Sequence, residues 1–162
     1  MTSFPSEHRF VTIEQVVQKT SPEVTDLDTL FEMWGLTRST QEAFWVIALD
    51  NVENVKTAIE VARGGFHDVI VHVPTVLAAV LTAHTDRFYV AHNHPSGPVS
   101  PTEDDVTLTA TIMQAANAAS LSFEDHIIVG PEGRFSFWEA GLLVRAEAMG
   151  TLARMKRKRK RG

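Results

Sequence analysis

The chain has 162 residues, of which 44% are hydrophobic, and this length suits one compact domain with a core of its own. It contains no cysteine, which excludes disulfides and thiolate metal sites and leaves histidine, aspartate and glutamate as metal ligands. No apolar run is long enough to span a bilayer, and residues 1–20 lack the apolar core of a signal peptide, so we expect a cytoplasmic protein with no membrane partner.

The charge is distributed unevenly along the chain. The formal net charge is −5, but Arg154 and the run Lys156–Arg161 supply seven positive charges, so the rest of the chain carries −12. An acidic body argues against a broad nucleic-acid surface, whereas the basic run is suited to weak, non-specific contact with DNA phosphates. We expect residues 154–162 to form a disordered tail because their like charges repel one another.

Residues 1–36 predict a helical N-terminal extension packed on the main domain. A short helical pattern runs over residues 11–17, and Pro22 interrupts the chain after it. A second helix is expected to begin at a cap on Asp26 or the residue before it, and Gly35 is placed to end it.

The main domain, residues 37–153, is expected to begin with two strands. Residues 44–49 form the continuous apolar run of a buried strand. After a polar turn at 50–54, residues 55–61 predict a second strand, and the two glycines at 64–65 break the pattern.

A helix and another strand follow. Pro74 suits a first helical turn, and apolar residues continue at helical spacing to Leu81, while residues 69–73 are either a strand or the approach to this helix. Residues 87–91 then predict a short strand that ends at His92.

The remaining elements follow a loop rich in proline, glycine and serine. A helix is predicted over 102–120, a strand over 122–129, a hairpin strand over 135–137 and a closing helix over 140–153. Strands mixed with helices predict a single α/β or α+β domain with a mixed sheet.

The stretch from Ala91 to Asp105 holds most of the candidate metal ligands. His92 and His94 lie two residues apart, and alternate residues at the end of an extended strand point to the same face. A catalytic zinc usually takes three protein ligands and leaves the fourth position for water. Asp105 is a candidate third ligand because it falls in the first turn of a helix, where the helix dipole favours a carboxylate.

Each part of this pattern also has a simpler interpretation. Thr102, followed three residues later by Asp105, resembles a capping box, and caps are more common than metal sites. Two histidines at a strand end are often polar surface residues, and an isolated His-x-His pair is a weak signal. The joint pattern of His-x-His, seven residues, Thr, two residues and Asp is harder to obtain from loop composition alone.

Three strings resemble the RadC-like branch of the JAB/MPN (JAMM) zinc metalloprotease superfamily. They are HNHPSG from His92, PTxxD ending at Asp105, and DHIIVG from Asp125, and the match of QExFWV from Gln41 strengthens the resemblance. The resemblance covers residues 42–139. It implies a curved mixed β-sheet flanked by helices, and zinc-dependent hydrolysis of a peptide or protein substrate at peptide or isopeptide bonds.

The resemblance also assigns roles to individual residues. It implies that His92, His94 and Asp105 bind Zn²⁺, which lowers the pKa of its water to about 7. Thr102 corresponds to a hydroxyl residue that helps to stabilise the tetrahedral oxyanion. Glu42 best matches the general base, which takes a proton from that water and passes it to the leaving amine.

The neighbouring residues of these strings are expected to have supporting roles. Asn93 is predicted to point to the opposite strand face and to be structural. Asp125 and His126 are expected to be a buried pair at a strand end or to support the ligands. This chain has Val73-Pro74-Thr75 where relatives often carry His-Pro-Arg, so the missing arginine affects substrate binding near that helix.

Two functions of other classes remain open alongside the zinc hydrolase. One is a DNA-associated accessory or repair protein that binds nucleic acid through its basic tail, which predicts salt-sensitive binding. The other is a non-catalytic MPN-type interaction scaffold, although the complete ligand set argues against a metal-free version of it.

Overall fold

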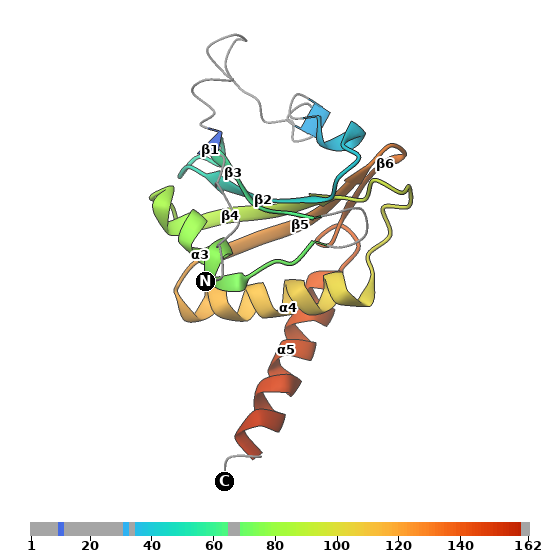
Figure 1. Ribbon diagram of the computed structural model, residues 1–162. Helices are drawn as coiled ribbons and strands as arrows, with labels where there is room; N and C mark the ends of the chain where they lie inside the picture. The colour runs from blue at the N-terminus through green and yellow to red at the C-terminus, as the bar shows by residue number, and fades with distance from the viewer. Residues whose placement is uncertain (1–9, 12–30, 33–34, 65–68, 160–162) are drawn as a thin grey trace, which may run out of the picture.

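The computed structural model describes residues 10–11, 31–32, 35–64 and 69–159. In this part of the chain six strands form one sheet in the order β1-β3-β2-β4-β5-β6. Helices α3 and α4 lie against one face of the sheet, and a segment that contains Phe31 and the short helix η1 lies against the other (Figure 1).

The strands and helices have the following bounds. The strands are β1 (Phe10–Val11), β2 (Ala43–Leu49), β3 (Val55–Arg63), β4 (Arg87–Asn93), β5 (Ser122–Gly130) and β6 (Gly133–Ser136). The helices are η1 (Leu36–Arg38), α3 (Val73–Thr82), α4 (Glu103–Ala118) and α5 (Leu142–Arg159). Strands β4 and β5 are parallel and the other paired strands are antiparallel, so the predicted mixed α/β fold is confirmed. None of the helices in the described residues has the length and apolar character needed to cross a membrane.

Strand β2 is buried on both faces, which explains its unbroken apolar sequence. Its even-numbered residues pack toward α3 and α4, whereas its odd-numbered residues pack in a cluster with Phe31 and Leu36. Side chains alternate between the two faces of a strand, so a strand covered on both sides needs apolar residues at every position. Phe31 and Leu36 lie in the predicted extension, yet at 1% and 2% exposure they belong to the core of the main domain.

The N-terminal prediction is wrong at Val11. This residue is expected to begin a helix over 11–17, but it lies in β1 and pairs with Ala58 of β3. Hydrogen bonding along the sheet edge is a tertiary interaction, and it outweighs a weak local helical pattern. Residues 12–17 and the expected cap at Asp26 lie outside the described residues.

The last helix is longer than the sequence predicts. A helix ending at Ala153 and a disordered tail over 154–162 are expected, but α5 continues to Arg159. Lysine and arginine have high helix propensity, and positive charge near a helix C-terminus is favoured by the helix dipole, which offsets the repulsion between like charges. Beyond its crossing with α4, α5 projects away from the body of the domain (Figure 1).

Candidate metal centre

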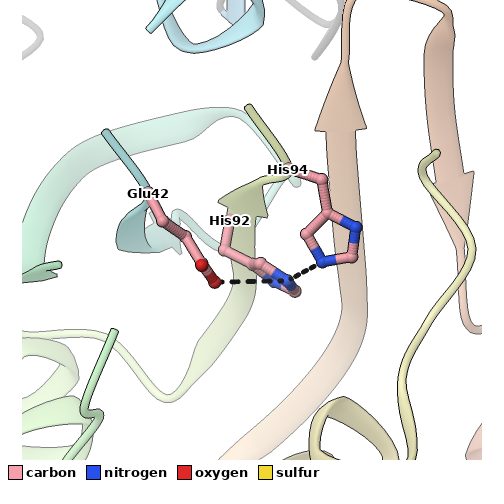
Figure 2. A group of neighbouring side chains, drawn as sticks. All are labelled: Glu42, His92 and His94. Carbon is pink, nitrogen blue, oxygen red and sulfur yellow. Dashed lines mark hydrogen bonds and ion pairs between the residues drawn. The ribbon is translucent and has the colours of Figure 1, made fainter. Parts of the chain in front are cut away.

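Strand β4 brings two histidines to one place. His92 lies within the strand and His94 directly follows it, and their two-residue spacing directs both side chains to the same side. Their Nε2 atoms lie 2.9 Å apart (Figure 2). His92 is buried and stacks on Phe44 with ring centroids 5.8 Å apart, so packing fixes the orientation of its ring.

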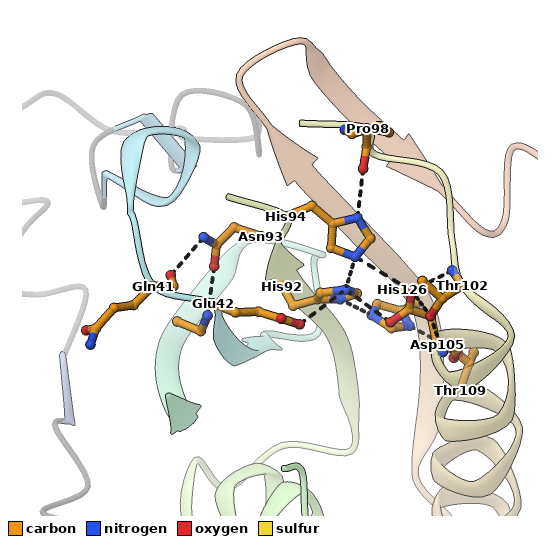
Figure 3. Close-up of polar contacts among 11 residues, drawn as sticks. Gln41, Glu42, His92, Asn93, His94, Pro98, Thr102, Asp105, Thr109 and His126 are labelled. Atoms are coloured by element: carbon orange, nitrogen blue, oxygen red, sulfur yellow. Dashed lines mark hydrogen bonds and ion pairs between the residues drawn. The ribbon is translucent and has the colours of Figure 1, made fainter. Parts of the chain in front are cut away.

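Helix α4 brings Asp105 to the same place. Thr102 is the N-cap of the helix, and its hydroxyl accepts the Asp105 N–H while Asp105 Oδ2 accepts the Thr102 N–H at 2.7 Å. Asp105 Oδ1 lies 3.2 Å from His92 Nε2, and Oδ2 lies 3.6 Å from His94 Nε2 (Figure 3). The capping box and the approach to the histidines are therefore compatible, because the cap orients the carboxylate toward them.

The centre stabilises positive charge. His94 Nδ1 lies 2.8 Å from the Pro98 carbonyl oxygen, which can only accept, so Nδ1 carries a proton and Nε2 of a neutral His94 has a bare lone pair. Burial alone would raise the pKa of Asp105, but hydrogen bonds with His92 and His94 lower it well below its ordinary value. The hydrogen bond to Asp105 raises the pKa of His94 although burial opposes this. A cation site needs these electrostatic properties.

The spacing of the three groups fits a zinc ion. Tetrahedral zinc with ligand bonds of about 2.0–2.1 Å places neighbouring ligand atoms about 3.3–3.4 Å apart. The two Nε2 atoms are 2.9 Å apart, and Asp105 lies 3.2 Å from His92 Nε2 through Oδ1 and 3.6 Å from His94 Nε2 through Oδ2. These distances lie near that value, although the two Asp105 contacts use different carboxylate oxygens. Imidazole nitrogen and carboxylate oxygen are also ordinary zinc ligands, so the donor set fits the metal in both chemistry and distance.

Glu42 approaches the histidines from the side opposite Asp105 (Figure 3). It directly precedes β2, and its Oε1 lies 4.0 Å from His92 Nε2. Glu42, His92 and His94 offer ligand atoms within 4.8 Å of one another, so this trio is also able to hold a metal ion. The shorter distance from Asp105 to His92 favours Asp105 as the third ligand and leaves Glu42 beside the centre.

Asn93, between the two histidines, holds the segment that carries Glu42. Its Oδ1 accepts the Ala43 N–H at 2.8 Å, and its Nδ2 donates to the Gln41 carbonyl at 3.0 Å. Asn93 does point away from the histidines, as the alternation of side chains predicts. Its partners lie about fifty residues earlier in the chain, so no local pattern predicts this contact with the backbone on both sides of Glu42.

The pair Asp125 and His126 lies in the middle of β5 and not at a strand end. His126 is fully buried with Nε2 2.8 Å from His92 Nδ1, and burial together with the nearby charge of His92 lowers its pKa well below the ordinary value. Asp125 accepts the backbone N–H groups of His126 and Trp138 and the Ser136 hydroxyl, and burial raises its pKa. Of the two expected roles, ligand support fits His126 and a buried structural role fits Asp125.

Thr109 contacts this group and was not predicted as a functional residue, because it falls on the apolar face of its helix. Its hydroxyl lies 2.6 Å from His126 Nδ1 and 2.6 Å from the Asp105 carbonyl oxygen. A buried hydroxyl on an apolar helix face, four residues after a candidate ligand, was the available signal.

The loop that follows His94 is seated against the end of β5. The His94 N–H donates to the Val129 carbonyl at 2.8 Å. At Gly130 a Cβ would lie 3.0 Å from both the Gly97 carbonyl oxygen and Val99 Cγ1, so a larger residue would require the loop to move by a few tenths of an ångström. The end of β5 therefore helps to place His94.

A cavity of about 510 Å³ adjoins the same end of β5. Its walls come from η1 and the residues before it and from the β5–β6 hairpin: Phe31, Glu32, Thr37, Arg38, Val129, Gly130, Pro131, Gly133 and Arg134. Val129 and Gly130 also contact the His94 loop, so the cavity and the candidate metal centre share a wall.

The fold and the site define an α/β domain whose candidate metal centre is built from two histidines and a carboxylate. Residues 19–142 match the RadC-like JAB domain family, and the chain belongs to this family. The resemblance to the RadC-like branch of the JAB/MPN superfamily is thereby confirmed.

Similar curated proteins share the name UPF0758 protein. The one from Porphyromonas gingivalis is 34% identical over 109 residues, which cover 67% of this chain and 48% of that protein. The one from Clostridium beijerinckii is 30% identical over 139 residues, covering 83% of this chain and 59% of that protein. One from Acinetobacter baumannii is 35% identical over 103 residues, which cover 64% of this chain and 44% of that protein. The chain spans about half the length of the curated relatives it matches.

Proposed function

We propose that the chain is a zinc-dependent metallohydrolase that cleaves peptide or isopeptide bonds. The observation that carries this proposal is the convergence of His92 Nε2, His94 Nε2 and the Asp105 carboxylate at separations of 2.9 to 3.6 Å. Membership of the RadC-like JAB family supports a metal-assisted hydrolysis. A zinc ion at this site would act as a Lewis acid and lower the pKa of a water molecule to about 7.

Glu42 is the proposed general base. Its carboxylate, 4.0 Å from His92, lies beside the proposed ligand set. It takes a proton from the attacking water as the water oxygen bonds to the carbonyl carbon, and it delivers that proton to the amine nitrogen as the C–N bond breaks. Asn93 keeps Glu42 in place by binding the backbone on both of its sides.

Thr102 is the proposed donor to the negative charge that develops on the substrate carbonyl oxygen. Its hydroxyl donates to Asp105 Oδ2 at 2.7 Å and accepts the Asp105 N–H at 3.1 Å. The proposed role therefore requires the O–H to turn from Asp105 to the substrate, while the bond from the Asp105 N–H is kept. Thr102 also orients Asp105 through the capping box.

Elemental analysis combined with a peptide and isopeptide library screen tests the proposal. We expect about one zinc per chain, because the three proposed ligands form a single site. Glu42→Gln should keep zinc and abolish hydrolysis, whereas Glu132→Gln, at an exposed turn position, should behave as the unsubstituted protein. Purified, unchelated protein without zinc would contradict the proposal, and unchanged turnover in Glu42→Gln would remove Glu42 as the base. Zinc binding without any hydrolysis would favour the MPN-type scaffold.

A second proposal concerns the basic end of α5. The helix projects from the acidic body and ends in the lysine and arginine run that begins at residue 156, which favours weak, non-specific DNA contact (Figure 1). Deletion of residues 154–162 should abolish DNA retention, and retention in the full chain should fall steeply as salt is raised. DNA binding that survives the deletion would contradict this proposal.

A further inference from the structure

A buried row of polar groups runs from helix α4 to the candidate metal centre. Thr109 Oγ1 lies 2.6 Å from His126 Nδ1, and His126 Nε2 lies 2.8 Å from His92 Nδ1 (Figure 3). At its other end Thr109 Oγ1 lies 2.6 Å from the Asp105 carbonyl oxygen. All three side chains are buried, with exposures of 0% for Thr109, 0% for His126 and 1% for His92.

The position of every proton in this row follows from its α4 end. A carbonyl oxygen only accepts hydrogen bonds, so the single hydroxyl proton of Thr109 is donated to the Asp105 carbonyl. Thr109 Oγ1 must then accept in its contact with His126, which places a proton on His126 Nδ1. A neutral His126 ring with its proton on Nδ1 accepts at Nε2, so the proton in the 2.8 Å contact between the two rings belongs to His92 Nδ1.

The consequence falls on the atom of His92 that faces the metal centre. A neutral imidazole carries one proton, and with that proton on Nδ1 the His92 Nε2 lone pair is bare. This is the atom that lies 2.9 Å from His94 Nε2 and 3.2 Å from Asp105 Oδ1. The opposite arrangement would put two oxygen lone pairs against each other across the 2.6 Å contact between Thr109 and the Asp105 carbonyl.

We propose that Thr109 is a positioning residue which, acting through His126, holds His92 in the tautomer that can bind a metal. A hydroxyl is needed at this position because it must donate to a carbonyl and accept from an imidazole at the same time. The part of this inference that concerns zinc affinity rests on the proposed function. The part that concerns the tautomer is a property of the metal-free protein.

Packing around His126 supports the inference because it prevents the ring from finding other partners. Its ring stacks on Phe137 at a centroid distance of 4.8 Å and an interplanar angle of 14°. Phe44 meets it edge-on at 5.5 Å. With apolar rings around it, each nitrogen of His126 has its polar partner in the row itself, Nδ1 with Thr109 and Nε2 with His92.

The test compares Thr109→Val, which replaces the hydroxyl by a methyl group of similar size, with Thr109→Ser, which keeps a hydroxyl. Thr111→Val is the matched control, since Thr111 lies on the same helix and its hydroxyl also binds a carbonyl four residues earlier, at 2.9 Å, but it is exposed. Long-range nitrogen–proton correlation NMR of the metal-free protein reports which His92 nitrogen is protonated. Competition against a chelator measures the zinc affinity.

In the unsubstituted protein and in Thr109→Ser we expect His92 to be protonated on Nδ1. In Thr109→Val we expect the proton to move to Nε2 and zinc affinity to fall about 10- to 100-fold, the usual effect of losing a partner behind a metal-bound histidine. Thr111→Val should change neither quantity. A folding defect alone in Thr109→Val, with the tautomer and the affinity unchanged, would reduce Thr109 to a packing residue and overturn the inference.

The tautomer also separates this inference from the proposed function. His92 protonated on Nε2 in the unsubstituted metal-free protein would overturn the inference even if zinc binds well. Because this measurement needs no variant, it tests the inference even if Thr109→Val fails to fold. Protonation on Nδ1 in a protein that binds no zinc would support the inference and contradict the proposed function.

Discussion

Replacing Asn93 by alanine tests how the domain holds Glu42. Asn93→Ala removes two hydrogen bonds, one accepted from the Ala43 N–H and one donated to the Gln41 carbonyl. The two losses differ in cost. Gln41 is exposed, so water replaces the lost donor, whereas Ala43 is 0% exposed and its N–H is left buried without its side-chain partner.

The expected magnitude follows from this difference. A stranded buried donor costs about 1–3 kcal/mol, and the replaced bond at Gln41 adds about 0.5 kcal/mol, so Asn93→Ala should lower the free energy of unfolding by about 1.5–3.5 kcal/mol. Zinc content should be unchanged because the three proposed ligands are untouched. Hydrolysis should fall on the order of 10²-fold, since a base displaced by about 1 Å loses much of its effect.

Urea denaturation of the metal-free protein measures the stability, and metal analysis and turnover are measured on the same preparations. Asn51→Ala, at an exposed turn position, is the control. It should change the free energy of unfolding by less than about 0.5 kcal/mol and leave zinc content and turnover unchanged. A loss below about 0.5 kcal/mol for Asn93→Ala would refute the reasoning about the stranded Ala43 N–H. Loss of zinc with unchanged stability would show that Asn93 acts on the histidines and not on Glu42.

Three further predictions concern the metal centre and the core. Zinc affinity should fall as the pH drops through the raised pKa of His94, because a protonated His94 has no lone pair for the metal. Competition with a chelator over a series of pH values measures this affinity. An affinity that does not change with pH would count against His94 as a ligand. Leu36→Ala should lower the free energy of unfolding, measured by thermal or chemical denaturation, by about 2–4 kcal/mol, because Leu36 is 2% exposed in the cluster that it forms with Phe31 and the odd-numbered residues of β2. A loss below about 0.5 kcal/mol, as for a surface residue, would show that η1 is dispensable. Gly130→Ala should lower the free energy of unfolding by about 1–3 kcal/mol and weaken zinc binding, since the new Cβ would lie 3.0 Å from two atoms of the loop after His94. Unchanged zinc affinity would mean that this loop adjusts to the added methyl group.

The sequence predicts the strands and helices of this domain well where local pattern and tertiary packing agree. The bounds of β2 to β5, α3 and α4 lie within two residues of those predicted, because apolar runs, glycines and the Thr102 cap all indicate the same limits. Val11 and residues 154–159 of α5 were predicted wrongly for opposite reasons. Pairing with β3 outweighs local preference at Val11, whereas at the end of α5 the helix propensity of lysine and arginine outweighs charge repulsion.

Residue spacing alone indicated the candidate site only where its residues are close in sequence, and Glu42 was indicated by the family resemblance. The spacing of His92, His94 and Asp105 follows from one strand end and one helix start, and both are visible in the sequence. The contacts of Asn93 with the Glu42 segment, and of Thr109 with His126, depend on how distant elements dock, and no local pattern encodes that. Whether His92, His94 and Asp105 bind zinc stays a prediction, and so does the catalytic role of Glu42 and Thr102.

Strands β4 and β5 run parallel, with α4 as the connection between them, and this arrangement separates two properties of the domain. All the proposed metal ligands, together with His126, come from one unbroken segment of chain, residues 87–130, whereas Glu42 lies directly before β2. Holding an ion and using it for catalysis can therefore be lost independently. A variant of this chain altered only before β2 should keep the proposed ligands while it loses the proposed base. For this chain, zinc content and hydrolysis are therefore two separate measurements, and the first does not predict the second.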